Sequence, residues 1–258
     1  MKRLLLHTSF LSVMLVAGAA CDAQRVDDRA RPGGDGFTAE QVCRTVDAAI
    51  RLPVDVHETS GLAISTHDPL VLWTHNDRGH GPVLYAVGAD GRLVARVHVT
   101  GAESVDWEDL EIAPCESGVC LYIADIGDNN AVRDGITIYE VPEPALNARA
   151  SAPARALHAR YPDGARDAES LFILPGGDMY IITKGTDGPV ILYRYPVAAR
   201  GESGVVLERV REAMAQPQHR MQYVTGATTV GDGSRVAIRT YGSIHFHASE
   251  DLVGGGVT

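Results

Sequence analysis

Carboxylates gather in the stretch from residue 103 to residue 130, ESVDWEDLEIAPCESGVCLYIADIGDNN, and another follows at Glu169. Carboxylate and amide oxygens are hard ligands, and Ca²⁺ takes roughly six to eight of them. Carboxylates that converge on one point raise one another's pKa unless a cation neutralises them. The sequence therefore predicts a Ca²⁺ site whose ligands come from Glu108, Asp125, Asp128, Asn129 and Glu169.

Two other interpretations of these acids stay open. They could pair with Lys184, Arg133, Arg166 and Arg239, or cap turns as Asp and Asn commonly do. The DIGDNN segment also lacks the EF-hand spacing, because no Glu stands at the twelfth position of the loop.

A metal ion beside an acid could support hydrolysis of a small ester, lactone or phosphate ester. The candidate catalytic residues are Glu108, Glu169, Lys184, Arg239 and His75. Lys184 and Arg239 could receive an anionic group, and His75 or His80 could act as a general base, although a histidine in a turn is usually just solvated. The sequence has no GxSxG, HExxH, Walker or CxxC motif, which disfavours serine hydrolases, zincins and NTPases. The competing hypothesis is a non-catalytic scaffold that binds a protein or glycan at the cell surface.

The elements that must position these residues are β-strands, because apolar residues recur at a two-residue spacing between turn signals. Two strands flank the turn at 116–119, with Leu110 and Ile112 on the first and Leu121 and Ile123 on the second. We expect four sets of strands: 61–65, 70–74, 83–87 and 93–99; 110–114, 120–125, 136–141 and 154–161; 170–174, 179–184, 190–195 and 205–210; 227–230, 235–240 and 243–247.

The sets repeat as text. SGLAIS, WEDLEI, AESLFI and TGATTV open them and place Ser60, Glu108, Glu169 and Thr225 in register. Quartets of short strands with tight hairpins are typical of propeller blades, so the expected fold is an all-β propeller of four-stranded antiparallel blades. A chance repeat of hairpins and an open β-sandwich are the alternatives.

The number of sets is small for a propeller, which usually has four to eight blades. The strand pattern at 42–52 could complete a last blade with the C-terminal strands. We expect a six-bladed type whose C-terminal blades are missing from this sequence, and Cys43 could have lost a disulfide partner with them.

Several phrases in order resemble a family of uncharacterised bacterial secreted or lipoprotein β-propellers described as WD40-like: THNDRGHGPVLYAV, DWEDLEI, YIADIGDNNAVRDGITIYEVPEP, YPDGARDAESLFI and RTY. The resemblance covers about residues 58–241. More remotely, the architecture resembles the calcium-dependent propellers of the gluconolactonase and strictosidine-synthase type, and the β-propeller phytases. The resemblance implies a fold and no particular reaction.

The N-terminus has the pattern of a secretory signal, with Lys2 and Arg3, an apolar run and small residues before Cys21. It resembles a bacterial lipoprotein signal, so residues 1–20 are the predicted leader, Cys21 the lipidated residue and 21–41 a flexible tether to a domain at 42–258. Ordinary cleavage of the signal is the alternative. With either kind of processing we expect the mature protein outside the cytoplasm, in the bacterial periplasm or cell envelope. If Cys21 is lipidated, the lipid is the expected contact with the membrane.

Cys115 and Cys120 flank a four-residue turn between two strands, which predicts a disulfide; a zinc site would need a second pair of ligands. The net charge of −10 argues against nucleic acid as the main partner, since phosphates need a basic surface. A small-molecule or glycan ligand at the mouth of the propeller is the expected partner.

Overall fold

The structure is a computed structural model that describes residues 49–254 of the chain. The predicted leader, Cys21, the tether, Cys43 and residues 42–48 of the possible closing strand lie outside this range; residues 49–52 contain no strand. Every strand in the described range belongs to a compact unit that begins at Leu52. Among the described residues, no helix has the length and apolar character needed to span a membrane.

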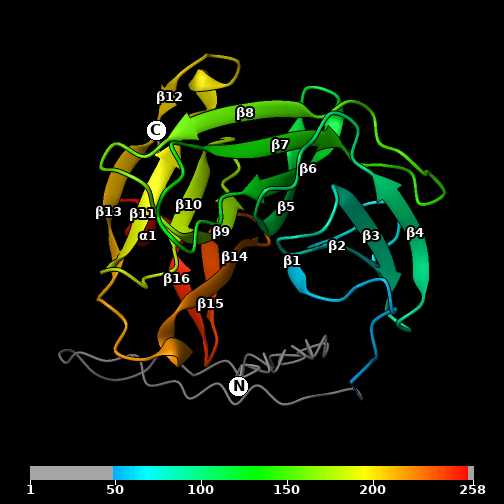
Figure 1. Ribbon diagram of the computed structural model, residues 1–258, viewed down its shortest axis with the longest axis horizontal. Helices are drawn as coiled ribbons and strands as arrows, with labels where there is room; N and C mark the ends of the chain where they lie inside the picture. Colours follow the sequence, from blue (N-terminus) through cyan, green and yellow to red (C-terminus); the bar gives the residue numbers. More distant parts are fainter. Residues whose placement is uncertain (1–48, 255–258) are drawn as a thin grey trace, which may run out of the picture. The chain divides into compact units, whose positions relative to one another are not determined.

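The described strands form four mainly antiparallel sheets, which we call blades 1 to 4 (Figure 1). Blade 1 contains β1 (Thr59–Ile64), β2 (Val71–Asn76), β3 (Val83–Gly88) and β4 (Leu93–His98). Blade 2 contains β5 (Trp107–Cys115), β6 (Gly118–Asp125), β7 (Ile136–Pro142) and β8 (Arg155–Arg160). Blade 3 contains β9 (Ala168–Ile173), β10 (Met179–Thr183), β11 (Val190–Tyr195) and β13 (Glu208–Met214). Blade 4 contains β14 (Val224–Val230), β15 (Arg235–Thr240) and β16 (Ile244–Ala248).

The predicted all-β propeller is therefore confirmed: the four sheets are blades whose innermost strands, β1, β5, β9 and β14, gather at one centre (Figure 1). Each strand of the four predicted sets overlaps an observed one. The turns also form where glycine was expected, because Gly91 and Gly177 adopt φ of 81° and 88°, which glycine reaches without a steric penalty.

Three hydrophobic cores fill the spaces between consecutive blades. Trp73, Leu84, Leu110 and Leu121 belong to the core of blades 1 and 2. A second core joins blades 2 and 3, and a third joins blades 3 and 4. Outer strands such as β4 bury alternate residues, whereas β9 and β10 are buried throughout because a blade covers each of their faces.

Two details differ from the prediction. The strand expected at 205–210 is divided: β12 (Val205–Val206) pairs in parallel with β8 of blade 2, and β13 then enters blade 3. Val205 and Leu207 are buried in the core between these blades, which explains why the segment is shared. In addition, β16 is followed by a short helix, α1 (Ser249–Val253), whose Leu252 and Val253 are buried in the core between blades 3 and 4. Two 3-10 turns, Val197–Ala199 and Arg220–Gln222, complete the elements.

A disulfide joins Cys115 to Cys120 across the β5–β6 hairpin, as the sequence predicted.

Candidate functional site

A β-bulge recurs at the start of each innermost strand. In blade 2, Trp107 pairs with Asp125 and Asp109 pairs with Ala124, so Glu108 is the extra residue. Glu169 and Thr225 are the extra residues in blades 3 and 4, and blade 1 has the same irregularity between Thr59 and Leu62, which includes Ser60. Bulges change the direction of a side chain and are frequent beside functional sites. The textual register of Ser60, Glu108, Glu169 and Thr225 thus corresponds to one repeated backbone feature.

Three carboxylates come together at this end of the blades, and we call them the acid cluster: Asp77, Asp106 and Glu108. One oxygen from each lies within 4.8 Å of the others. Asp77 directly follows β2, Asp106 directly precedes β5, and Glu108 is the bulge residue of β5. Blades 1 and 2 therefore both contribute to the cluster.

The acid cluster has little compensating positive charge. Arg78 Nε lies 3.9 Å from Asp106 Oδ1, but its side chain is 59% exposed, so solvent screens this pair. Asp106 Oδ1 is buried and accepts no hydrogen bond from a described residue. The Ser60 hydroxyl makes a long hydrogen bond of 3.4 Å to Glu108 Oε2. At least one buried carboxylate oxygen thus lacks the partner that burial normally demands.

The pKa values of two carboxyl groups in the acid cluster are raised. Burial, with the nearby charge of Asp77, raises the pKa of Asp106 to about 6. Burial also raises the pKa of Glu108, and the charges of Glu169, Asp77 and Asp106 raise it further. The acid cluster therefore favours a bound proton or a bound cation near neutral pH.

Because Gly127 has no side chain, it leaves room for the buried carboxylates of Glu108 and Asp106. A Cβ on Gly127 would collide with Glu108 Oε1 and would lie 2.7 Å from Asp106 Cγ. The glycine of the DIGDN phrase is thus required by close approach of side chains from the neighbouring strand.

Lys184 neutralises the acids of blade 3. Its ammonium contacts the carboxylate of Glu169 and lies 3.7 Å from Asp167 Oδ2. The other oxygen of Asp167 accepts the backbone N–H of Asp128 at 3.0 Å. Glu169, predicted as a metal ligand, is therefore paired with the lysine that the alternative interpretation named.

Asp125 and Asp128 organise the loop after β6. Asp125 makes an ion pair of 2.8 Å with Arg133 and accepts the backbone N–H groups of Val105 and Asp106. Asp128 accepts the backbone N–H of Arg133 at 2.7 Å. Asn129 is exposed. Of the five predicted ligands, only Glu108 belongs to the acid cluster, while Asp77 and Asp106 were missing from the predicted set.

The remaining catalytic candidates lie elsewhere. His75 is fully buried, packs edge-on against Trp107 at 5.5 Å and has a pKa lowered by that burial. Arg239 donates from Nε to the Thr225 hydroxyl at 3.0 Å and from Nη2 to the Thr225 carbonyl. Arg239 therefore supports the bulge of blade 4, where Gly226 leaves room for its guanidinium.

Two further acids on β5 bind the backbones of other blades. Asp109 accepts the N–H groups of Leu171 in β9 and Ala227 in β14, at 2.9 and 3.2 Å. Glu111 accepts the Thr228 hydroxyl at 2.9 Å. Burial raises the pKa of each acid to about 7. Alternation marked Leu110 as the inward residue, but nothing in the spacing identified these acids as contacts between blades.

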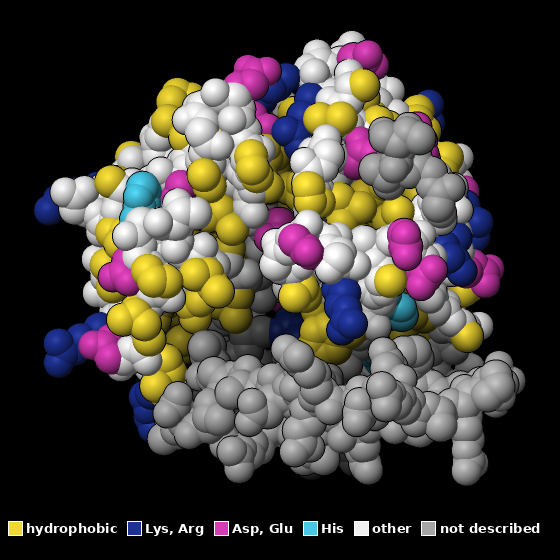
Figure 2. Space-filling model, turned by 180° about the vertical axis from the view of Figure 1, so that it is seen from behind, with side chains coloured by type: hydrophobic (Ala, Val, Ile, Leu, Met, Phe, Trp, Pro, Cys, Tyr) yellow, Lys and Arg dark blue, Asp and Glu magenta, His cyan; other side chains and the backbone are white. Residues whose placement is uncertain are grey.

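These features define a β-propeller with buried acids at its centre. On the face seen in Figure 2, the described acidic side chains are scattered among basic and hydrophobic ones.

No family model and no curated protein matches the chain, so the family resemblance stays a prediction. Among solved structures, an auxiliary nutrient-binding protein from Bacteroides thetaiotaomicron is 10% identical, with 72% of this chain and 36% of that chain covered and a TM-score of 0.43. Hydrazine synthase from Kuenenia stuttgartiensis is 14% identical, with 72% and 57% covered and a TM-score of 0.41. A streptogramin B lyase is 10% identical, with 77% and 67% covered and a TM-score of 0.40. The chain thus spans about a third of the first and just over half of the second.

Proposed function

We propose that this propeller binds Ca²⁺ at the acid cluster and that the bound ion completes a site for a small molecule or glycan at the mouth of the propeller. Two observations on Asp106 support the proposal. Its Oδ1 is buried and accepts no hydrogen bond from a described residue, and one of its carboxylate oxygens lies within 4.8 Å of an oxygen of Asp77 and of Glu108.

The donor chemistry favours calcium over transition metals. All three groups are carboxylates, whereas zinc sites in proteins are usually built from Cys and His. Three side chains supply at most six oxygens, and Ca²⁺ takes roughly six to eight. Coordination positions would therefore remain for water, for a backbone carbonyl or for hydroxyl and carboxylate groups of a ligand.

Charge accounting supports the same conclusion. Asp77, Asp106, Glu108 and Glu169 interact with one another electrostatically, and Lys184 is the ammonium among them. A divalent cation at the acid cluster would offset the excess negative charge and would return the pKa of Glu108 towards its ordinary range.

The test is thermal unfolding with EGTA, with Ca²⁺ and with Mg²⁺, on the wild type and Asp106→Asn. A ligand at 100 times its dissociation constant adds about 2.7 kcal/mol to the free energy of unfolding. We expect Ca²⁺ to raise the Tm of the wild type and to leave that of Asp106→Asn unchanged. Asp134→Asn is the matched control, because Asp134 is exposed and makes no ion pair with a described residue. An equal response of wild type and Asp106→Asn would contradict the proposal.

A second candidate function is hydrolysis of a small ester, lactone or phosphate ester. The observation that favours it is the ammonium of Lys184, which is 13% exposed and interacts with Glu108, a member of the acid cluster. Bound Ca²⁺ would polarise the reacting oxygen. Glu108 and Glu169 would hold or move protons, and Lys184 would receive an anionic group.

Turnover separates the enzyme from a binding scaffold. We expect a hydrolase to release product from a panel of esters, lactones and phosphate esters in Ca²⁺ and to lose this activity in EGTA. Saturable binding of a glycan or protein without turnover would instead support the scaffold.

The lipid anchor and the location in the bacterial envelope are part of this proposal, and they rest on the leader pattern before Cys21. Incorporation of labelled fatty acid into the wild type and its loss in Cys21→Ser would support the anchor. Equal labelling of the two proteins would exclude Cys21 as its site.

A further inference from the structure

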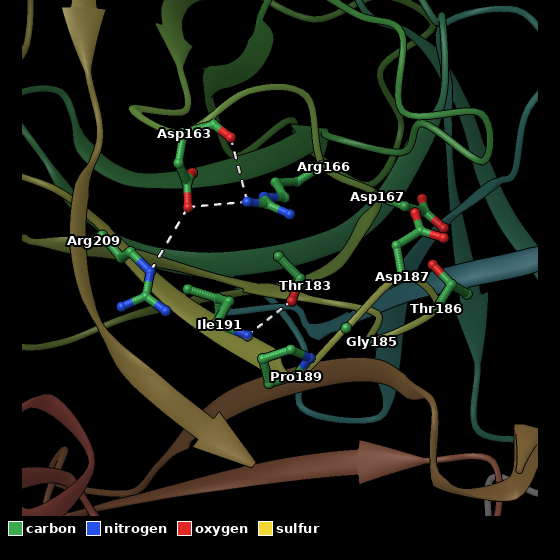
Figure 3. A pocket seen from close by; sticks show the side chains of 11 residues that line it. Asp163, Arg166, Asp167, Thr183, Gly185, Thr186, Asp187, Pro189, Ile191 and Arg209 are labelled. Atoms are coloured by element: carbon green, nitrogen blue, oxygen red, sulfur yellow. Dashed lines mark hydrogen bonds and ion pairs between the residues drawn. The ribbon is translucent and has the colours of Figure 1, made fainter. Parts of the chain in front are cut away.

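A cavity of ≈ 130 Å³ opens between the loop that precedes β9 and the turn that joins β10 to β11 (Figure 3). The acid cluster of Asp77, Asp106 and Glu108 does not line this cavity, whereas Asp167, which pairs with Lys184, does. Pockets for drug-sized ligands usually measure about 300–1,000 Å³. This cavity therefore suits a molecule of only a few non-hydrogen atoms.

One side of the cavity presents guanidinium groups. Arg166 Nη2 donates to Asp163 Oδ2 at 3.0 Å, and Arg209 Nε lies 3.7 Å from the same carboxylate oxygen. Asp163 also accepts the buried Tyr193 hydroxyl at 2.8 Å. Arg209 has one further acid, Glu212, at 3.9 Å, but that carboxylate is 60% exposed and screened by solvent. Within the cavity, two guanidinium groups thus share one carboxylate whose hydrogen bonds are already made.

The opposite side presents acids. Figure 3 shows Asp167, Thr186 and Asp187 on this side, away from Arg166 and Arg209. Asp167 is already bound to Lys184 and to the Asp128 backbone. Asp187 is exposed and has no ion pair with any residue in the described range. Asp187 is therefore the carboxylate available to a cation.

A ligand that satisfies both sides must carry opposite charges at its two ends. We propose that this cavity binds a small amino-carboxylate, with the ligand's carboxylate against Arg209 and Arg166 and its ammonium group against Asp187. The planar guanidinium groups match a carboxylate geometrically. The Thr186 hydroxyl can donate or accept a hydrogen bond between the two charged ends.

The test uses isothermal titration of the full chain with a series of unbranched amino-carboxylates, from glycine to 6-aminohexanoate. EGTA is present throughout, so that the result is independent of the acid cluster and of the proposed function. We expect saturable binding with an optimum at one chain length. Propionate and propylamine, which carry one charge each, should bind at least tenfold more weakly than the best member of the series.

Arg209→Ala and Asp187→Asn are the informative variants. Arg209 is 42% exposed and its two ion pairs are long, so its removal should leave the fold intact. We expect each variant to weaken binding at least tenfold. The matched controls are Arg92→Ala, whose side chain is 87% exposed in blade 1, and Asp232→Asn in an exposed turn; both should bind like the wild type.

Three outcomes would overturn the proposal: no member of the series binds, propionate binds as tightly as the best amino-carboxylate, or Asp187→Asn binds like the wild type. Circular dichroism of each variant confirms that a loss of binding is not a loss of fold.

Discussion

The carboxylate of Asp109 accepts the backbone N–H of Ala227 at 3.2 Å, although 118 residues separate them in the chain. The same oxygen accepts the N–H of Leu171 at 2.9 Å. One side chain of blade 2 thereby binds the innermost strands of blades 3 and 4. These contacts satisfy the backbone N–H groups of Leu171 and Ala227, which are only 0% and 8% exposed.

The first prediction concerns this contact. Asp109→Ala leaves buried backbone N–H groups without acceptors, and each such group costs about 1–3 kcal/mol. Because the substitution also removes a buried charge, we expect a net loss of about 3 kcal/mol in the free energy of unfolding. Urea denaturation measures it, and Asp134→Ala on the surface should change it by less than about 0.5 kcal/mol. Equal stability of the two variants would show that Asp109 does not hold the blades together.

The second prediction concerns pH. The pKa of Glu111 is about 7 in the folded protein, above its ordinary value of 4.5, because burial disfavours the charged form. Between these pH values the folded state binds more protons than the unfolded state, so this group lowers stability as the pH rises through that window. Glu111→Gln removes the titration. We expect it to reduce the loss of stability between pH 5 and pH 8 by an amount of order 1–3 kcal/mol.

Melting temperatures of wild type and Glu111→Gln across this pH range test the sign. The difference between the two proteins must change in favour of the variant as the pH increases. Parallel curves would mean that Glu111 does not titrate in the window. Asp109 titrates in the same direction, so the wild-type curve should not flatten completely in the variant.

The third prediction concerns Gly127. A Cβ there would force apart the carboxylates of Glu108 and Asp106, and overpacking typically costs about 1–3 kcal/mol. We expect Gly127→Ala to lower the Tm in EGTA and also to weaken the response to Ca²⁺. Gly81→Ala is the matched control, because a Cβ on Gly81 meets no atom within 4 Å. Similar behaviour of the two variants would contradict the close approach.

The fourth prediction concerns Lys184. Removing one partner of a buried ion pair typically costs about 3–5 kcal/mol, because the remaining charge has no partner. Lys184→Met should therefore destabilise the fold strongly, while the double variant Lys184→Met/Glu169→Gln should recover part of that loss. A double-mutant cycle gives the coupling energy. Additive effects of the two substitutions would show that Lys184 and Glu169 do not stabilise each other.

Much of the fold was predictable from local sequence. The two-residue spacing of Leu110 and Ile112 predicted β5 as a strand, and glycines such as Gly177 mark the hairpins. The spacing is typical of a half-buried strand, whereas β5 is buried on both faces from Trp107 to Glu111. The repeated phrases located Glu108 and Glu169 at equivalent points, and the structure places a β-bulge at both. The disulfide also followed from local spacing, because only four residues separate Cys115 from Cys120 across a hairpin.

The candidate site was only partly predictable. Asp77, Asp106 and Glu108 come from two blades, and their meeting depends on how those blades pack. In the sequence, Asp125 and Asp106 are both acids that flank a predicted strand, so they look equivalent. In the structure, the Arg133 guanidinium lies 2.8 Å from Asp125, and this ion pair helps to organise the loop after β6. The two-residue spacing of a strand and the residue types of a turn depend on close neighbours in the chain, so the sequence alone predicts these elements. Which carboxylate meets an arginine, a lysine or another carboxylate is decided by distances across the propeller, and only the tertiary structure brings those groups together.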